Sequence, residues 1–66
     1  MNMDKLKGRV VEYRIQQEDL GKIIKLSSRS INRKLNGHSK FNQEEISKIK
    51  KLLNLTNDEV VEIFLD

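Results

Sequence analysis

The chain has 66 residues, a formal net charge of +3 and no cysteine. A chain of this length can form one small domain, which buries only about 60% of its unfolded surface. Without cysteine it has no disulfides or thiolate metal ligands, and it shows neither a signal-peptide pattern nor a membrane-spanning run. We therefore expect a single domain over residues 1–66 that works in the cytoplasm, away from membranes.

The charge is distributed unevenly along the chain. Residues 1–40 carry ten Lys and Arg against four Asp and Glu, a net of +6, whereas residues 41–66 carry three against six, a net of −3. A polyanion would approach the basic part first. An ordinary solvated surface explains the same imbalance, so charge alone does not decide between the two interpretations.

Apolar residues recur at helical spacing along the whole chain, which predicts an all-α fold. We expect five short helices, over about residues 3–14, 17–24 and 28–36, then a fourth after Asn42 and a fifth after Thr56. The residues expected to face inward in the first three helices are Leu6, Val10 and Tyr13; Leu20, Ile23 and Ile24; and Ile31 and Leu35. Phe41 and Phe64 are expected to be interior as well, and Gly21 allows close approach of another helix.

Polar residues mark the helix ends. Ser27 is placed to cap the third helix, and Asn36-Gly37 ends it. Asn42 with Glu45 approximates a capping box, and Thr56 with Glu59 forms a second one.

The last helix has apolar side chains on two faces. Val60, Ile63 and Phe64 share one face, while Val61 and Leu65 make another. Either a wide groove buries both faces, or Val61 and Leu65 meet a partner. The sequence leaves both interpretations open.

The third helix carries the candidate reading residues. If Ile31 and Leu35 face inward, a rotation of about 100° per residue turns Arg29 and Arg33 outward, with Asn32 and Asn36 beside them and Ser28 at the exposed tip. Arginine matches the O6 and N7 acceptors of guanine, and asparagine suits adenine. The candidate base-reading residues are Ser28, Arg29, Asn32 and Arg33. The candidate phosphate contacts are Gln17, Ser30, Lys34, Asn36, His38, Lys40 and Gln43.

The sequence gives little support to an enzyme. His38 is the only histidine, and no spaced His, Cys, Asp or Glu set suggests a metal site or a nucleophile. The acid pairs Glu44-Glu45 and Asp58-Glu59 fall in first helical turns, where capping and the helix dipole explain them. We expect no catalytic activity, cofactor, metal or small-molecule substrate.

Three runs carry a family resemblance: QEDLG at residues 17–21, LSSRSI at residues 26–31 and RKLNG at residues 33–37. They resemble the helix-turn-helix of the Cro and repressor-like family of phage and bacterial regulators. The resemblance implies a lambda-repressor-like domain in which the second and third helices form the motif. It also implies that Gln17 contacts the DNA backbone, that Ser28, Arg29 and Arg33 read bases, and that Asn36 with its loop touches phosphate.

Two positions depart from that family pattern. Lys25 stands where the family usually has glycine, and a left-handed lysine costs roughly 1 to 2 kcal/mol. Gln16 replaces the usual Thr or Ser cap of the second helix and is a weaker cap.

Together these features predict a sequence-specific transcription regulator of phage Cro type. We expect it to take part in a lysis/lysogeny switch in a bacterial host cell, and to bind double-stranded operator DNA as a homodimer. The alternative is a modulator or antirepressor that binds the cognate phage repressor, with Val61 and Leu65 at the contact. An antitoxin would need a toxin-binding extension, which we do not find.

Overall fold

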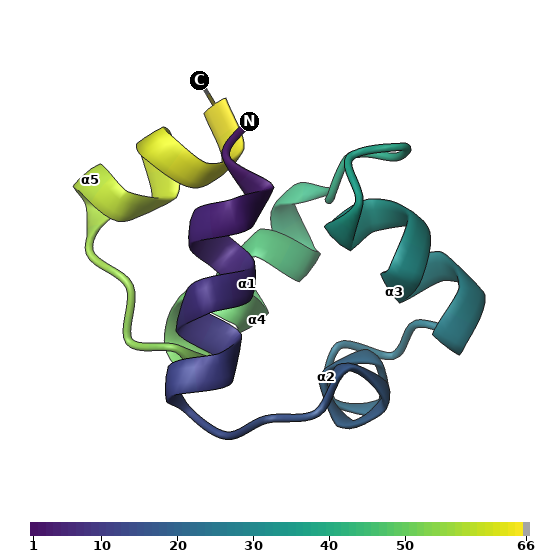
Figure 1. Ribbon diagram of the computed structural model, residues 1–66. Coiled ribbons are helices and arrows are strands. Elements are labelled where there is room, and N and C mark those ends of the chain that lie inside the picture. Colours follow the sequence, from purple (N-terminus) through teal and green to yellow (C-terminus); the bar gives the residue numbers. More distant parts are fainter. Residues whose placement is uncertain (66) are drawn as a thin grey trace.

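Five short helices and the turns between them make up residues 1–65, the part of the chain that the computed structural model describes (Figure 1). The elements are α1 (Met3–Glu12), α2 (Gln17–Ile23), α3 (Ser28–Leu35), α4 (Gln43–Leu52), α5 (Asn57–Val60) and its π-helical continuation η1 (Val61–Leu65). The predicted all-α fold with five helices is confirmed. Within residues 1–65, no helix is long and apolar enough to cross a membrane.

The helix starts follow the predicted caps. The Ser27 hydroxyl accepts a hydrogen bond from the Ser30 N–H at 3.2 Å. Both capping boxes, Asn42 with Glu45 and Thr56 with Glu59, have their two reciprocal hydrogen bonds. The Gln16 side chain makes no cap hydrogen bond at the start of α2, which confirms it as the weaker cap.

Four helices end in the same left-handed turn. The residue that leaves the helix has a positive φ in each case: 55° at Arg14, 62° at Lys25, 81° at Gly37 and 52° at Asn54. The next N–H then bonds back to a carbonyl five residues earlier, as Leu26 does to Gly21 at 2.7 Å. This is the Schellman arrangement, which satisfies the last carbonyls of a helix. The left-handed lysine predicted between α2 and α3 is confirmed.

Replacing Lys25 with glycine is expected to raise the free energy of unfolding by about 0.5–1 kcal/mol, because glycine adopts a positive φ without strain. Lys22→Gly is the matched control. Lys22 lies inside α2, where glycine costs about 1 kcal/mol. Urea denaturation of both variants checks this prediction. A less stable Lys25→Gly protein would contradict the strain at this turn.

One hydrophobic core is shared by α1, α2, α3, α4 and η1, and Val60 of α5 packs against it. Its members are Met3, Leu6, Val10, Leu20, Ile24, Ile31, Leu35, Phe41, Ile49, Leu53, Leu55, Ile63 and Phe64. Gly21 lets α2 and α3 approach closely, as predicted, because a Cβ there would lie 3.0 Å from the Leu26 carbonyl oxygen and 3.3 Å from Ile31 Cγ2. The core therefore fixes α3 against α2.

Two residues expected in the interior are exposed. Tyr13 is 42% exposed because α1 ends at Glu12 and Tyr13 already belongs to the turn. Ile23 is 48% exposed, since α2 turns Leu20, Gly21 and Ile24 toward its neighbours and leaves Ile23 on the flank. Both expectations were wrong because the helix boundary and the roll of α2 depend on tertiary packing.

The C-terminal element packs beside the N-terminus (Figure 1). The Asn2 N–H donates to the Ile63 carbonyl at 2.8 Å, and Arg9 of α1 pairs with Glu59 at 2.7 Å. Val61 and Leu65 face away from the core and are 48% and 71% exposed. The expectation that a groove within the chain buries both faces is therefore wrong.

Candidate nucleic-acid interface

The outer face of α3 presents two free arginines. Ile31 and Leu35 hold the helix from beneath, with 0% and 3% of their surface exposed. Arg29 and Arg33 lie on the solvent side and form no ion pair within residues 1–65. Ser28 and Asn32 are exposed on the same helix. The four predicted base-reading residues are therefore accessible together.

Unpaired cations gather on α2, α3 and the loop that follows. Within the described residues, these five side chains make no ion pair: Lys22, Lys25, Arg29, Arg33 and Lys40. Four other cations pair with acids: Lys5 and Arg9 of α1, Lys34 of α3 and Lys48 of α4. Within the described residues, Lys7, Arg14, Lys50 and Lys51 form no ion pair either. The acids of residues 17–40 are Glu18 and Asp19, both exposed in the first turn of α2. Five cations without an ion pair thus lie on and beside α2 and α3, although such cations are not confined to this part of the molecule.

A chain of hydrogen bonds connects this face to α1. Gln17 Nε2 donates to Asn32 Oδ1 at 3.4 Å, Asn36 Nδ2 donates to the same oxygen at 3.0 Å, and Lys7 Nζ donates to Asn36 Oδ1 at 2.9 Å. Sequence reasoning missed Lys7. It lies 29 positions from Asn36, so no local spacing could have paired them.

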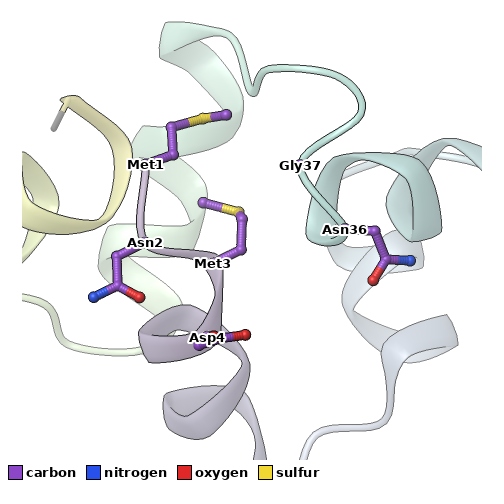
Figure 2. A pocket seen from close by; sticks show the side chains of 6 residues that line it. All are labelled: Met1, Asn2, Met3, Asp4, Asn36 and Gly37. Carbon is purple, nitrogen blue, oxygen red and sulfur yellow. The ribbon is translucent and has the colours of Figure 1, made fainter.

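A groove of about 380 Å³ runs between the start of α1 and the end of α3. Figure 2 shows Met1, Asn2, Met3 and Asp4 along one side, with Asn36 and Gly37 on the other. The groove therefore separates the two helices at this end. The hydrogen bond from Lys7 to Asn36 connects α1 to the C-terminal end of α3.

The sequence profile of one protein family, described as a protein of unknown function (DUF739), matches residues 1–66. The chain belongs to the DUF739 family. No curated protein and no solved structure gives a significant match.

In this DUF739 protein Lys34 differs from the other predicted phosphate contacts. Its Nζ lies 2.7 Å from Glu45 Oε1, with side chains 17% and 9% exposed, and 5.8 Å from the centre of the Phe41 ring. Burial tends to raise the pKa of Glu45, but the hydrogen bonds from Lys34 and the Asn42 N–H, together with the Lys34 charge, outweigh it and lower the pKa. Because the Lys34 charge is compensated inside the fold, we leave Lys34 out of the candidate interface.

Replacing Glu45 with glutamine is expected to lower the free energy of unfolding at neutral pH by about 1–3 kcal/mol, because Lys34 loses its charged partner. The pKa of Glu45 is below its ordinary value of 4.5 in the folded protein, so its contribution is complete above about pH 4.5 and is lost as the pH falls through the lowered pKa. Urea denaturation at several pH values should show wild type and variant converging in acid.

The control for that prediction is Glu44→Gln. Glu44 is the neighbouring residue, its side chain is 80% exposed, and it lies 3.7 Å from Lys48. Surface pairs of this kind contribute about 0–1 kcal/mol. Equal losses in the two variants, or a Glu45→Gln deficit that persists below the pKa of Glu45, would contradict the assigned role.

The remaining predicted phosphate contacts lie on α3 or close to it. Ser30 is half-buried, and its hydroxyl accepts from the Ser27 hydroxyl at 3.1 Å. The others are exposed: Gln17, Asn36, His38, Lys40 and Gln43. Gln17 and Gln43 are the first residues of α2 and α4, where helix N–H groups without helical partners attract anions.

Proposed function

We propose that this DUF739 protein is a sequence-specific DNA-binding regulator of transcription. In this proposal α2 and α3 form a helix-turn-helix, and α3 enters the major groove of operator DNA. One observation carries it: Arg29 and Arg33 extend freely from a short helix that Ile31 and Leu35 anchor in the core. The sequence resemblance to the Cro and repressor-like family supports the same function, including a place in a phage genetic switch.

The residues divide into two roles. Arg29 and Arg33 suit guanine edges, with Ser28 and Asn32 beside them. Phosphate contacts would come from Gln17, Asn36, His38, Lys40 and Gln43. Gln17 fits this role because the one hydrogen bond that its Nε2 donates, to Asn32, leaves a second N–H for a phosphate oxygen.

The test is selection from random duplex DNA. The purified protein is incubated with a pool of duplexes that carry a randomised central segment, and bound DNA is amplified and sequenced over several rounds. We expect one short motif to be enriched, rich in guanine where the arginines read. A pool that stays random through all rounds would contradict sequence-specific binding.

Two copies are needed for a full operator, because one small module reads only a half-site. We propose that Val61 and Leu65 form the contact between copies, since they are apolar and exposed and lie on one element. Replacing both with serine is expected to shift the protein toward monomer. Operator binding should then weaken at least about tenfold, because a monomer cannot bind both half-sites at once as a dimer does. Sedimentation velocity measures the first effect directly.

Val11→Ser is the matched control for this surface. Val11 is apolar and 73% exposed, but it lies on α1. It should leave both the molecular mass and the operator affinity unchanged. A monomeric wild type at concentrations that saturate the operator would contradict the proposed dimer contact.

A second candidate function is a modulator that binds the cognate phage repressor. The exposed pair Val61 and Leu65 favours this function, because two acidic side chains are exposed nearby: Asp58 on α5, and Glu62 on η1, which also pairs with Lys5. Acidic side chains around an apolar contact would complement the basic DNA-binding face of a repressor. Titration with purified repressor, monitored by sedimentation, tests this candidate: comigration supports it, and independent sedimentation contradicts it.

A further inference from the structure

The hydrogen bonds between Lys7 and the outer face of α3 have a fixed direction. A lysine ammonium only donates, so the atom of Asn36 that faces Lys7 at 2.9 Å is the oxygen Oδ1. Asn36 must then turn its Nδ2 to Asn32, where it donates to Oδ1 at 3.0 Å. A donor-only group on α1 thus sets the orientation of two amides on α3.

The oxygen of Asn32 is fully used by the protein itself. It accepts from Asn36 and, over 3.4 Å, from Gln17, and a carbonyl oxygen has two lone pairs. The Asn32 Nδ2 group has no hydrogen-bond partner within residues 1–65, and the residue is exposed. If the Asn32 amide were reversed, its N–H groups would face the N–H groups of Asn36 and Gln17. Asn36 cannot turn to accommodate that reversal without facing its own Nδ2 to Lys7.

We propose that Lys7 is a positioning residue that holds Asn32 with its N–H donors toward DNA, so that Asn32 reads bases through their acceptors. This inference rests on the proposed function. Guanine fits best with its adjacent O6 and N7, and thymine fits through O4. The usual asparagine pairing with adenine needs an acceptor for the adenine N6 amino group. The structure therefore changes the sequence-based assignment of Asn32 from adenine to guanine or thymine.

The first experiment uses the free protein and its side-chain amide signals in ¹H–¹⁵N spectra. Lys7→Met removes the donor, and we expect the Asn32 and Asn36 amide signals to shift and exchange faster with water. Lys7→Arg keeps a donor-only cation and should leave those signals near their wild-type positions. Lys5→Met is the control for charge, because Lys5 is on the same helix but pairs with Glu62. Unchanged Asn32 and Asn36 signals in Lys7→Met would overturn the positioning role.

The second experiment measures base preference on duplexes selected by the wild-type protein, with each of the four bases placed in turn at the position that Asn32 reads. We expect wild type and Lys7→Arg to prefer guanine or thymine, and Lys7→Met to lose about five- to tenfold of that discrimination. In Asn32→Asp, one carboxylate oxygen can still accept from Gln17 and Asn36, while the second oxygen replaces the NH₂ group that faces DNA. This variant should shift the preference toward cytosine or adenine, which carry amino donors.

The outcomes separate this inference from the proposed function. A wild-type preference for adenine, or full discrimination in Lys7→Met, would overturn the inference while DNA reading stands. Failure of the wild-type protein to bind any selected duplex would overturn both. In that case the amide spectra still show whether Lys7 orients Asn32 in the free protein.

Discussion

Ile31→Ala is expected to lower the free energy of unfolding by about 2–5 kcal/mol, because it removes a buried side chain and leaves a cavity. Ile31 is 0% exposed and lies against Gly21, at the contact that holds α3 on α2. At about 0.05–0.15 kcal/mol per residue, a chain of this size has only about 3–10 kcal/mol in total. The variant should therefore unfold at much lower urea concentration or temperature.

The chain offers a matched control for this prediction. Ile23 is the same residue type on the adjacent helix but is 48% exposed. Ile23→Ala should change the free energy of unfolding by no more than about 0.5 kcal/mol. Circular dichroism during urea denaturation measures both variants. Similar losses at the two positions would contradict the packing of α3 described above.

Arg29→Ala and Arg33→Ala are each expected to weaken binding to a selected operator by about 1–3 kcal/mol, which corresponds to a factor of about 5 to 150. The physical reason is that each guanidinium is free in the unbound protein and would be matched by guanine acceptors in the complex. On random DNA the same variants lose only the nonspecific attraction of one charge. Fluorescence anisotropy with operator and scrambled duplexes at a fixed salt concentration measures the difference.

Lys40→Ala is the control for the arginine variants. Lys40 is an exposed, unpaired cation in the loop after α3. As a phosphate contact, it should weaken operator and random binding alike. If Arg29→Ala and Arg33→Ala also lost the same factor on both duplexes, the arginines would be phosphate contacts and base reading by them would be refuted.

The sequence predicted features that depend on neighbouring residues. The caps at Ser27, Asn42 and Thr56 are bonds to the residue three positions on, so they could be found from spacing alone. The outward position of Arg29 and Arg33 followed from Ile31 and Leu35 through the regular rotation of a helix. The left-handed Lys25 was predicted from the family resemblance, because the family usually has glycine at this position.

Features that depend on contacts between distant residues were not predicted. Lys7 and Asn36 lie 29 positions apart, and Lys34 and Glu45 lie 11 apart. The exposed position of Ile23 depends on how far α2 rolls against α3, which Gly21 helps to set. A helical wheel gives relative directions around one helix, but it does not give the partner that each direction meets. For the site, this means that the arginines were found from sequence and the residues that orient Asn32 were not.

The most direct test of the central claim, that the outer face of α3 binds DNA, is an NMR titration of the ¹⁵N-labelled protein with a selected operator duplex. We expect the largest backbone amide shifts in α3 (Ser28–Leu35) and at Gln17 and Gln43, whose N–H groups open α2 and α4. Saturation should occur at one protein chain per half-site. Unchanged α3 amides at saturating DNA, or shifts confined to the Val61–Leu65 element, would contradict the account.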